Sequence, residues 1–371
     1  MRKDWEVKKL GDVCEISYGN RVVKSRDCGS LYPVYGGGGA TFFVDSFNRE
    51  NAVIVSRFGM SPKCVRFVKG KFFLNDSGLS LIANKNILCQ SYLDVAMFAL
   101  NDTIYSLGKG AAQKNLDVIA FNELSIKYPI SFIDQQQIVE ELDSLTSIIE
   151  KQKKQLEELD NLAQAIFYDM FGDPIENEKG WEVKKMDNIC NITSSKRIYS
   201  HEYVETGIPF YRGKEITEKC KSLNLSVELF ISVEKYEELK ENFGVPQIGD
   251  LLLTAVGTIG NIWIVDTETP FYFKDGNILW LKNFVNTNPI FFKFLLELQI
   301  SEFKNKLANG CAYNALTIMN LKILNVIIPP LPLQQQFASK IEAIEKQKEL
   351  IKKSIKETED LFNSRMDYYF N

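Results

Sequence analysis

The sequence predicts an α+β protein in which two mixed α/β domains are joined by two long helices. Three observations lead to this prediction. Residues 132–171 and 333–371 each carry apolar side chains at a 4-3-4-3 spacing, which keeps one narrow stripe on a single helix face. The segments before these two helices repeat one another. In both segments, short runs rich in Val, Ile, Phe and Tyr alternate with Gly and Asn turns, as the strands of a mixed sheet do.

The first long helix should run from Phe132 to Phe171. At about 1.5 Å per residue it is roughly 58 Å long, so its stripe must lie against another helix. The segment from Leu333 onward supplies one, because it repeats the same glutamine-rich start and heptad 199 residues later. Two copies in one chain favour an intramolecular pair over a coiled coil built for dimerisation. Apart from Gln152, Lys348 and Thr358, the seam consists of Ile138, Leu142, Leu145, Ile149, Leu156, Leu159, Ala163, Ile166 and Met170, facing Phe337, Ile341, Ile344, Ile351, Ile355 and Phe362.

The globular segments share a sequence frame. Trp5 to Lys9 (WEVKK) returns as Trp181 to Lys185 at an offset of 176, and AVIVSRFG from Ala52 matches DLLLTAVG from Asp250 at an offset of 198. The second copy therefore holds about 22 extra residues, in which SVEKYEELKENFG predicts a short surface helix. The predicted division is 1–132 and 172–332 for the two domains, 133–171 for the central helix and 333–371 for the C-terminal helix.

Local patterns predict the smaller elements inside this frame. Strands are expected at 52–58, 63–68, 72–74, 251–255, 262–265, 271–273 and 278–281, and helices at 90–100 and 288–307. The prolines at 329–332 should hold the chain extended just before the second long helix.

Composition places the chain among ordinary globular proteins. Of its 371 residues, 45% are hydrophobic and 25% are charged. Residues 1–10 are polar, and no apolar run approaches the ~20 residues of a membrane span. The seven cysteines form no CxxC pair and His201 is the single histidine, so no zinc site is expected. We expect reduced thiols in a cytoplasmic protein with no membrane partner.

The charge is distributed unevenly along the chain. The net charge of the chain is −4. Residues 1–132 carry 17 basic and 12 acidic side chains, whereas residues 172–332 carry 17 basic and 20 acidic side chains. Residues 133–171 carry only 3 basic and 9 acidic side chains, so the first long helix is a poor binder of phosphate. The two globular segments remain the candidates for nucleic-acid binding.

Catalytic motifs are weak in this sequence. No GxxxxGK[ST] loop and no N-P-P-[FY] tetrapeptide of adenine methylation is present. The run from Tyr35 to Gly39 lacks the spacing of a dinucleotide loop; it suits a flexible tip that lets the backbone approach a ligand such as a phosphate, or an ordinary β-turn. Asp173 with Glu182 and Lys184 imitates a nuclease metal site, but the E-x-K part belongs to the repeated WEVKK strand. We therefore expect a chain without catalytic or metal-binding residues.

Basic residues interleave with aromatic residues and glycines in the first domain, as in Arg57-Phe58-Gly59 and Arg66-Phe67. This pattern suits phosphate contacts that frame a few base contacts. The matching positions of the second domain are less basic, and a plain surface role is the alternative for any one residue. The candidate DNA-contacting residues are Tyr35, Gly36, Gly37, Gly38, Arg57, Lys63, Lys109, Gln113, Lys114 and Asn115 in the first domain, and Arg212, Lys214, Thr254, Lys274, Tyr313 and Asn314 in the second.

The whole arrangement resembles the specificity subunit of type I restriction-modification systems. Both domains open with W-x-x-K-x-[LM] and close with G-x-x-x-x-x-L, a proline, a glutamine box and a heptad helix. The resemblance implies that each domain is a target recognition domain that reads one half of a bipartite DNA site, with an internal pseudo-two-fold repeat. It also implies that the long helices pack as an antiparallel coiled coil, fix the spacing between the domains and dock two DNA methyltransferase subunits. In the glutamine box, Asp134-Gln135-Gln136 and Leu333-Gln334-Gln335 replace the Glu-Gln common in the family.

The resemblance assigns the chemistry to partner proteins. This chain is expected to bind double-stranded DNA and no cofactor, while S-adenosylmethionine, ATP and Mg²⁺ belong to methyltransferase subunits and to any ATP-dependent restriction subunits. Two other classes of function remain open from the residues. A coiled-coil adaptor with two protein-binding heads would show no salt-dependent, sequence-selective DNA binding, and a catalytic subunit would need metal- or S-adenosylmethionine-dependent activity of its own.

Overall fold

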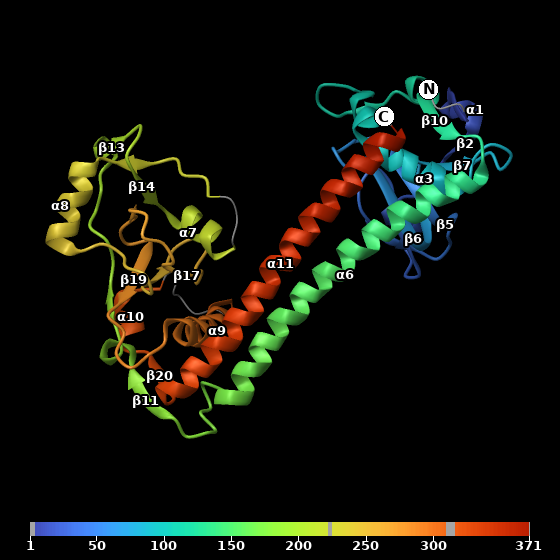
Figure 1. Cartoon of the computed structure of the whole chain (residues 1–371). Helices are drawn as coiled ribbons and strands as arrows, with labels where there is room; N and C mark the ends of the chain where they lie inside the picture. The colour runs from blue at the N-terminus through green and yellow to red at the C-terminus, as the bar shows by residue number, and fades with distance from the viewer. Residues whose placement is uncertain (1–3, 222–224, 309–315, 371) are drawn as a thin grey trace. The chain divides into compact units, whose positions relative to one another are not determined.

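The computed structural model describes residues 4–221, 225–308 and 316–370, with the side chains of 302–308 left out. The chain divides into two compact units (Figure 1). Unit 1 comprises Met1–Gln155 and Ile351–Asn371, and unit 2 comprises Leu156–Leu350. Helices α6 (Phe132–Phe171) and α11 (Leu331–Phe370) pass through both boundaries, so each unit contains a part of each long helix.

Unit 1 is built on a mixed sheet of order β2-β7-β5-β6-β3-β4. Strand β3 pairs parallel with β6, and the other neighbours pair antiparallel. Figure 1 shows α3 beside strands β5 and β7, which it contacts. The sheet strands are β2 (Cys14–Tyr18), β3 (Tyr32–Tyr35), β4 (Phe43–Val44), β5 (Arg49–Ser56), β6 (Val65–Leu74) and β7 (Gly78–Ala83); the helices are α1 (Leu10–Val13), α2 (Lys24–Asp27), α3 (Gln90–Ala99), α4 (Asn101–Ser106) and α5 (Val118–Asn122); further strand pairs are β1 (Trp5–Lys9) with β10 (Ser125–Pro129) and β8 (Gly108–Lys109) with β9 (Asn115–Leu116).

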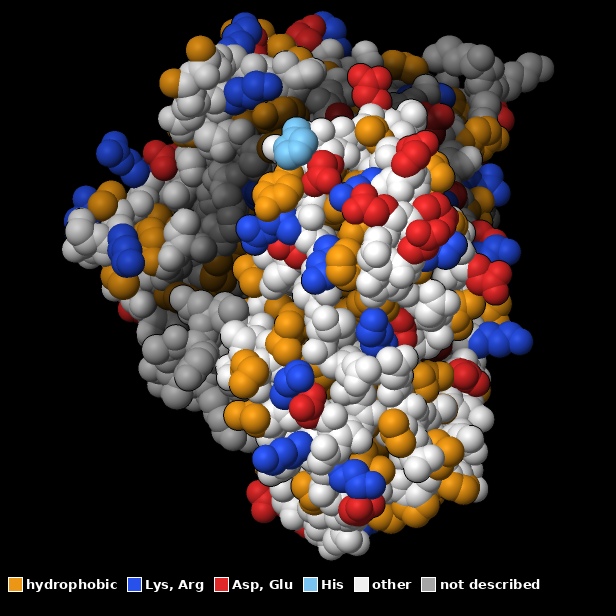
Figure 2. All heavy atoms as spheres, turned by 90° about the vertical axis from the view of Figure 1, so that its left-hand side faces the viewer, with side chains coloured by type: hydrophobic (Ala, Val, Ile, Leu, Met, Phe, Trp, Pro, Cys, Tyr) orange, Lys and Arg blue, Asp and Glu red, His pale blue; other side chains and the backbone are white. Residues whose placement is uncertain are grey.

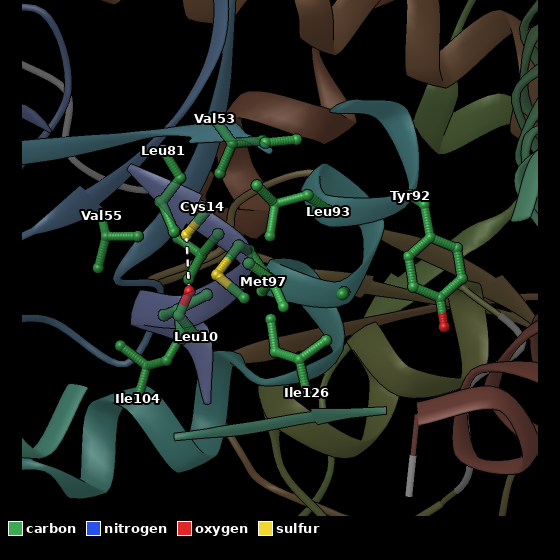
Figure 3. Packing of buried hydrophobic residues seen from close by; sticks show 14 of the residues in the cluster. Leu10, Cys14, Val53, Val55, Leu81, Tyr92, Leu93, Met97, Ile104 and Ile126 are labelled. Atoms are coloured by element: carbon green, nitrogen blue, oxygen red, sulfur yellow. Dashed lines mark hydrogen bonds between the residues drawn. The ribbon is translucent and has the colours of Figure 1, made fainter. Parts of the chain in front are cut away.

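The core of unit 1 lies between the sheet and its helices (Figure 3). Val53 and Leu81 from the sheet meet Leu93 and Met97 from α3, and all four are 3% exposed or less. In the same cluster the Cys14 thiol donates to the Leu10 carbonyl, and burial raises its pKa to about 12. Each cysteine in the described part of the chain is unpaired.

Unit 2 divides its strands between two smaller sheets, with orders β12-β19-β16-β17 and β13-β15-β14-β18. Its core contains a cluster of buried aromatic rings in which Phe167 of α6 packs against Phe291, Phe294 and Phe337. The strands are β12 (Asn191–Thr193), β13 (Tyr203–Val204), β14 (Ile208–Tyr211), β15 (Phe230–Ile231), β16 (Leu251–Thr254), β17 (Ile262–Ile264), β18 (Tyr272–Phe273), β19 (Ile278–Lys282) and the pair β11 (Glu182–Lys185) with β20 (Asn325–Ile328); the helices are α7 (Gly213–Cys220), α8 (Val233–Phe243), α9 (Pro289–Ala308) and α10 (Ile318–Lys322), with 3-10 turns at Met186–Asn188 and Ser200–Glu202.

Most predicted elements are confirmed, and two are corrected. The runs at 63–68 and 72–74 form one strand, β6, because Gly70 adopts a φ of +79° and lets the chain continue through an irregular point of the ladder. Helix α11 begins at Leu331, earlier than expected, so Pro332 lies in its first turn. The amide groups of a first turn have no partner within the helix, so a proline there removes no hydrogen bond.

Equivalent glutamines join each long helix to its own unit. In unit 1 the buried Gln135 amide accepts from the Cys89 N–H at 2.8 Å and donates to the Ile87 and Pro129 carbonyls. The same bonds recur in unit 2, where Gln334 accepts from Asn288 and donates to the Asn286 and Pro329 carbonyls. The glutamine box therefore ties the start of α6 to the segment just before α3, and the start of α11 to the segment just before α9.

We expect Gln135→Ala to lower the free energy of unfolding of unit 1 by about 2–3 kcal/mol, since it leaves the buried Pro129 carbonyl and the part-buried Cys89 N–H and Ile87 carbonyl without this partner. The measurement is the urea midpoint, with Gln136→Ala as the matched control because Gln136 is exposed. Equal midpoints for the two variants would contradict a structural role for the box.

The two long helices contact each other within unit 1. Gln152 Nε2 of α6 donates to Ser354 Oγ of α11 at 2.7 Å, and the Tyr369 hydroxyl donates to Glu141 at 2.6 Å. Higher residue numbers in one helix face lower ones in the other, so these parts of α6 and α11 run antiparallel.

Unit 2 contains the same kind of contact. Lys348 Nζ lies 2.7 Å from the Asp160 carboxylate, and the Phe167 ring packs edge-on against Phe337. In both units the predicted seam residues are buried or half-buried. In the described part of the chain, no helix is long and apolar enough to cross a membrane.

Candidate nucleic-acid interface

Three segments predicted to contact DNA converge at one end of the unit 1 sheet. Arg57 follows β5, and its carbonyl accepts from the Leu116 N–H at 2.8 Å, which joins it to the β8–β9 hairpin. Asn115 of that hairpin accepts from the Gly59 N–H at 3.3 Å. On the other side, the glycine loop after β3 comes so near that a Cβ on Gly37 would lie 2.2 Å from the Phe58 carbonyl oxygen. The close approach explains why this loop needs a glycine at 37.

Arg57 lies half-buried at this convergence, directly after β5. Its guanidinium lies 4.9 Å from the ring centre of Tyr18 and 4.5 Å from that of Phe58, and it donates to the Asp76 carbonyl. No carboxylate pairs with Arg57 among the described residues. Two aromatic rings therefore orient a cation whose charge is not neutralised, which is what a phosphate contact requires.

Residues beside Arg57 hold the glycine loop in place. Arg66 of β6 donates from Nη1 to the carbonyls of Gly37 and Gly38, at 3.0 and 3.1 Å. The Ser56 hydroxyl donates to the Gly37 carbonyl at 2.6 Å, and Ser77 Oγ accepts from the Gly37 N–H. Sequence reasoning did not single out Ser77, because one serine outside a motif carries no recognisable signal. The glycine run is therefore a fixed loop, with its Gly38 tip open.

The remaining candidates in unit 1 have mixed environments. Lys63 is exposed in the turn between β5 and β6. Lys114 Nζ lies 4.0 Å from the centre of the Tyr105 ring, which orients it as Arg57 is oriented. Lys109, in contrast, pairs with Asp117 at 2.5 Å, and this pairing is the main cause of the lowered pKa of the Asp117 carboxyl. Gln113 reaches the same area, since a Cβ on Gly59 would lie 3.2 Å from its Nε2.

Unit 2 repeats two backbone hydrogen bonds of this site. The Tyr35 carbonyl accepts from the Asn75 N–H at 2.8 Å, and in unit 2 the Tyr211 carbonyl accepts from the Lys274 N–H at the same distance. Leu316 N–H donates to the Ala255 carbonyl at 3.2 Å, as the hairpin of unit 1 donates to the residue after β5. The position of Arg57 is therefore occupied by a buried alanine in unit 2.

Each candidate cation of unit 2 that the structure describes lies near a carboxylate of the same unit. Arg212 pairs with Glu215 and Glu228, Lys214 pairs with Glu228, and Lys274 lies 3.6 Å from Asp275. Figure 2 shows Lys and Arg side chains interspersed with Asp and Glu over one face of the molecule, without a basic patch.

One predicted contact of unit 2 needs correction, and two fall outside the structure. Thr254 is fully buried, and its hydroxyl donates to the Thr258 carbonyl and accepts from the Asn261 N–H at 3.1 Å. It therefore shapes the loop after β16, as Ser56 does in unit 1, and does not face a ligand. The predicted contacts Tyr313 and Asn314 lie outside the described residues.

The residues that imitate a nuclease site do not assemble into one. The Asp173 carboxylate accepts from the backbone N–H groups of Ile175 and Glu176, and Glu182 pairs with Lys184 on its own strand. Among the described residues, no group of three or more His, Cys, Asp or Glu side chains is placed to hold a metal ion. His201 is exposed and stacks on Tyr199, with ring centres 5.8 Å apart.

Comparisons with known proteins concern the chain as a whole. A family model described as the type I restriction modification DNA specificity domain matches residues 2–160 and 178–360. A Haemophilus influenzae protein named as a type I restriction enzyme specificity subunit is 26% identical, over 98% of this chain and 94% of its own length. The type I restriction enzyme MjaIX specificity subunit of Methanocaldococcus jannaschii is 24% identical, over 92% of this chain and 87% of its own length. The crystal structure of the S subunit of a type I restriction-modification system from M. genitalium shares the fold, with a TM-score of 0.62 at 17% identity over 99% and 96% of the two chains.

Proposed function

Because this chain belongs to the type I restriction modification DNA specificity family, we propose that it reads a bipartite, asymmetric DNA target and directs methyltransferase subunits to it. The chain is a specificity subunit, and its role is recognition of a DNA target. In the proposal, each unit reads one half of the target, and catalysis, S-adenosylmethionine, ATP and Mg²⁺ belong to the partner subunits.

One observation carries the proposal for the half-sites. The glycine loop, Arg57 and the β8–β9 hairpin converge in unit 1, and unit 2 repeats two backbone hydrogen bonds of this region, Lys274 to Tyr211 and Leu316 to Ala255, with different side chains around them. Shared backbone contacts surrounded by different side chains suit two domains that recognise different bases. We further propose that the units form a pseudo-two-fold repeat and that α6 and α11 act as an antiparallel coiled coil between them.

We expect the methylated motif to consist of two different half-sites separated by a gap. The physical reason is that Tyr35 to Gly38 stands where unit 2 has Tyr211 to Lys214, and a different set of donors and acceptors meets the base edges. Methylome sequencing of a host that carries this chain with its neighbouring genes measures the motif. A palindromic motif would contradict the asymmetry.

The same complex distinguishes target recognition from an adaptor role. A specificity subunit bound to its methyltransferase should prefer its motif over a scrambled duplex, with an affinity that falls as salt is raised. Binding that is indifferent to both sequence and salt would favour an adaptor with two protein-binding heads.

A further inference from the structure

We propose that Arg212 and Lys214 form a site for one phosphate of the DNA backbone, and that the carboxylate of Glu228 occupies this site in the free chain. The inference rests on the proposed function and adds to it a named contact in unit 2 and a competitor for that contact. The competitor lies within the same chain, 14 residues after Lys214.

The two cations converge on one carboxylate. Arg212 Nη2 donates to Glu228 Oε2 at 2.8 Å, and Lys214 Nζ donates to Glu228 Oε1 at 2.5 Å. Each oxygen of the carboxylate is therefore held by a different cation. Hydrogen bonds from Lys214 and then from Arg212 lower the pKa of Glu228 to about 2, so the group is fully ionised at neutral pH.

Glu228 and Glu215 play different parts around Arg212. The Glu215 side chain is fully buried, and its carboxylate accepts from both the backbone N–H and the Nη2 of Arg212. The Glu228 side chain is 53% exposed and lies on an irregular segment before β15. Glu215 therefore positions the guanidinium permanently, whereas Glu228 makes bonds that water or another anion can replace.

A DNA phosphate matches what Glu228 supplies. Both groups carry one negative charge, and both present two oxygens that can be shared between an arginine fork and a lysine ammonium. Arg212 and Lys214 bring two positive charges, and buried Glu215 cancels one, so one monovalent anion restores neutrality. The N-terminus of α7, which begins at Gly213, adds a favourable dipole for that anion.

The site lies beside the loop that unit 2 uses in place of the Arg57 loop of unit 1. Thr217 of α7 lies 3.2 Å from the Thr258 hydroxyl and accepts from the Asn261 side chain at 2.8 Å. A phosphate at Arg212 and Lys214 would therefore flank the loop at 256–260, in the way that phosphate contacts frame base contacts. Unit 1 has no equivalent competitor, because among the described residues no carboxylate pairs with Arg57.

The test compares Glu228→Gln with Glu241→Gln in the full chain bound to its methyltransferase subunits. Both substitutions remove one negative charge from unit 2, but Glu241 is exposed and pairs with no cation in the described part of the chain. The probe is a duplex carrying the methylated motif, with dissociation constants measured at fixed ionic strength. We expect Glu228→Gln to lower the dissociation constant about three- to tenfold, since two exposed ion pairs no longer compete with DNA, and Glu241→Gln to change it by less than about twofold.

A second pair of variants locates the effect. In a Lys214→Gln background, where one of the two cations is missing, the gain from Glu228→Gln should shrink. An equal gain in both backgrounds, or an equal effect of Glu228→Gln and Glu241→Gln, would overturn the site while the wild-type complex still selects its motif. If the wild-type complex itself fails to prefer the motif over a scrambled duplex, the proposed function fails instead.

Discussion

One heptad added to each long helix should lengthen the gap of the DNA target and leave the bases of both half-sites unchanged. The added rise is about 10.5 Å, close to three base pairs at ~3.4 Å each. Binding should weaken even where the new gap fits, because three more base pairs also turn the second half-site by roughly 100° at about 10.5 base pairs per turn.

The structure indicates where the heptads should be inserted. Gln155 and Ile351 are the residues at which the two units divide, so insertion after Gln155 and before Ile351 leaves the contacts within each unit intact. Repeating residues 149–155 in α6 and 351–357 in α11 also repeats the bonded pair Gln152 and Ser354, which keeps the seam in phase.

The measurement is the methylated motif of the lengthened variant, together with its affinity for duplexes of graded gap length. A matched variant with the heptad in α6 alone should lose binding, since its helices no longer pair along their length. Altered half-site bases with an unaltered gap would show that the helices do not set the spacing.

Arg57→Glu should weaken binding to the target about tenfold or more, equivalent to about 1.4 kcal/mol, without unfolding the chain. The substitution replaces a cation oriented by Tyr18 and Phe58 with an anion that repels phosphate. Because Arg57 is half-buried and pairs with no carboxylate in the described residues, its removal leaves no buried charge alone.

The affinity of the assembled complex, measured across a salt titration, tests this result. Lys85→Glu is the matched control, since Lys85 is exposed beyond the opposite end of β7 and the charge change is identical. If the two variants weaken DNA binding equally, Arg57 acts only through its contribution to the net charge of the protein. A lowered thermal midpoint for Arg57→Glu alone would indicate a structural role.

Local patterns were sufficient for the long helices and most of the short elements. The heptads predicted α6 from Phe132 to Phe171. This was possible because a helix depends on signals between residues that are close in sequence, namely the apolar stripe, the absence of glycine and proline, and the turn residues at its ends. The repeated WEVKK frame likewise predicted strands β1 and β11. The start of α11 was missed by two residues, because the same proline can end an extended segment or begin a helix.

The candidate site depended on contacts that no sequence window contains. Residues 36–38, 57–59 and 108–116 meet only because parallel pairing of β3 with β6 and antiparallel pairing of β5 with β6 and β7 bring their ends together. The sequence named these residues by type but could not show that they form one surface. It also could not show that Arg66 and Ser77 hold the loop.

The candidate DNA-contacting residues also differ in their burial and in the charges around them. Arg57 and Arg212 are the same residue type, with a glycine two positions after Arg57 and one position after Arg212, and the sequence named both as candidates. The fold leaves Arg57 between two aromatic rings and places two carboxylates against Arg212. Chain chemistry by itself determined the helices, the repeat and the family, since these depend on spacing along the sequence. Which cations have a carboxylate partner in the free chain was decided by tertiary packing, because an ion pair joins residues that only the folded chain brings within a few ångströms.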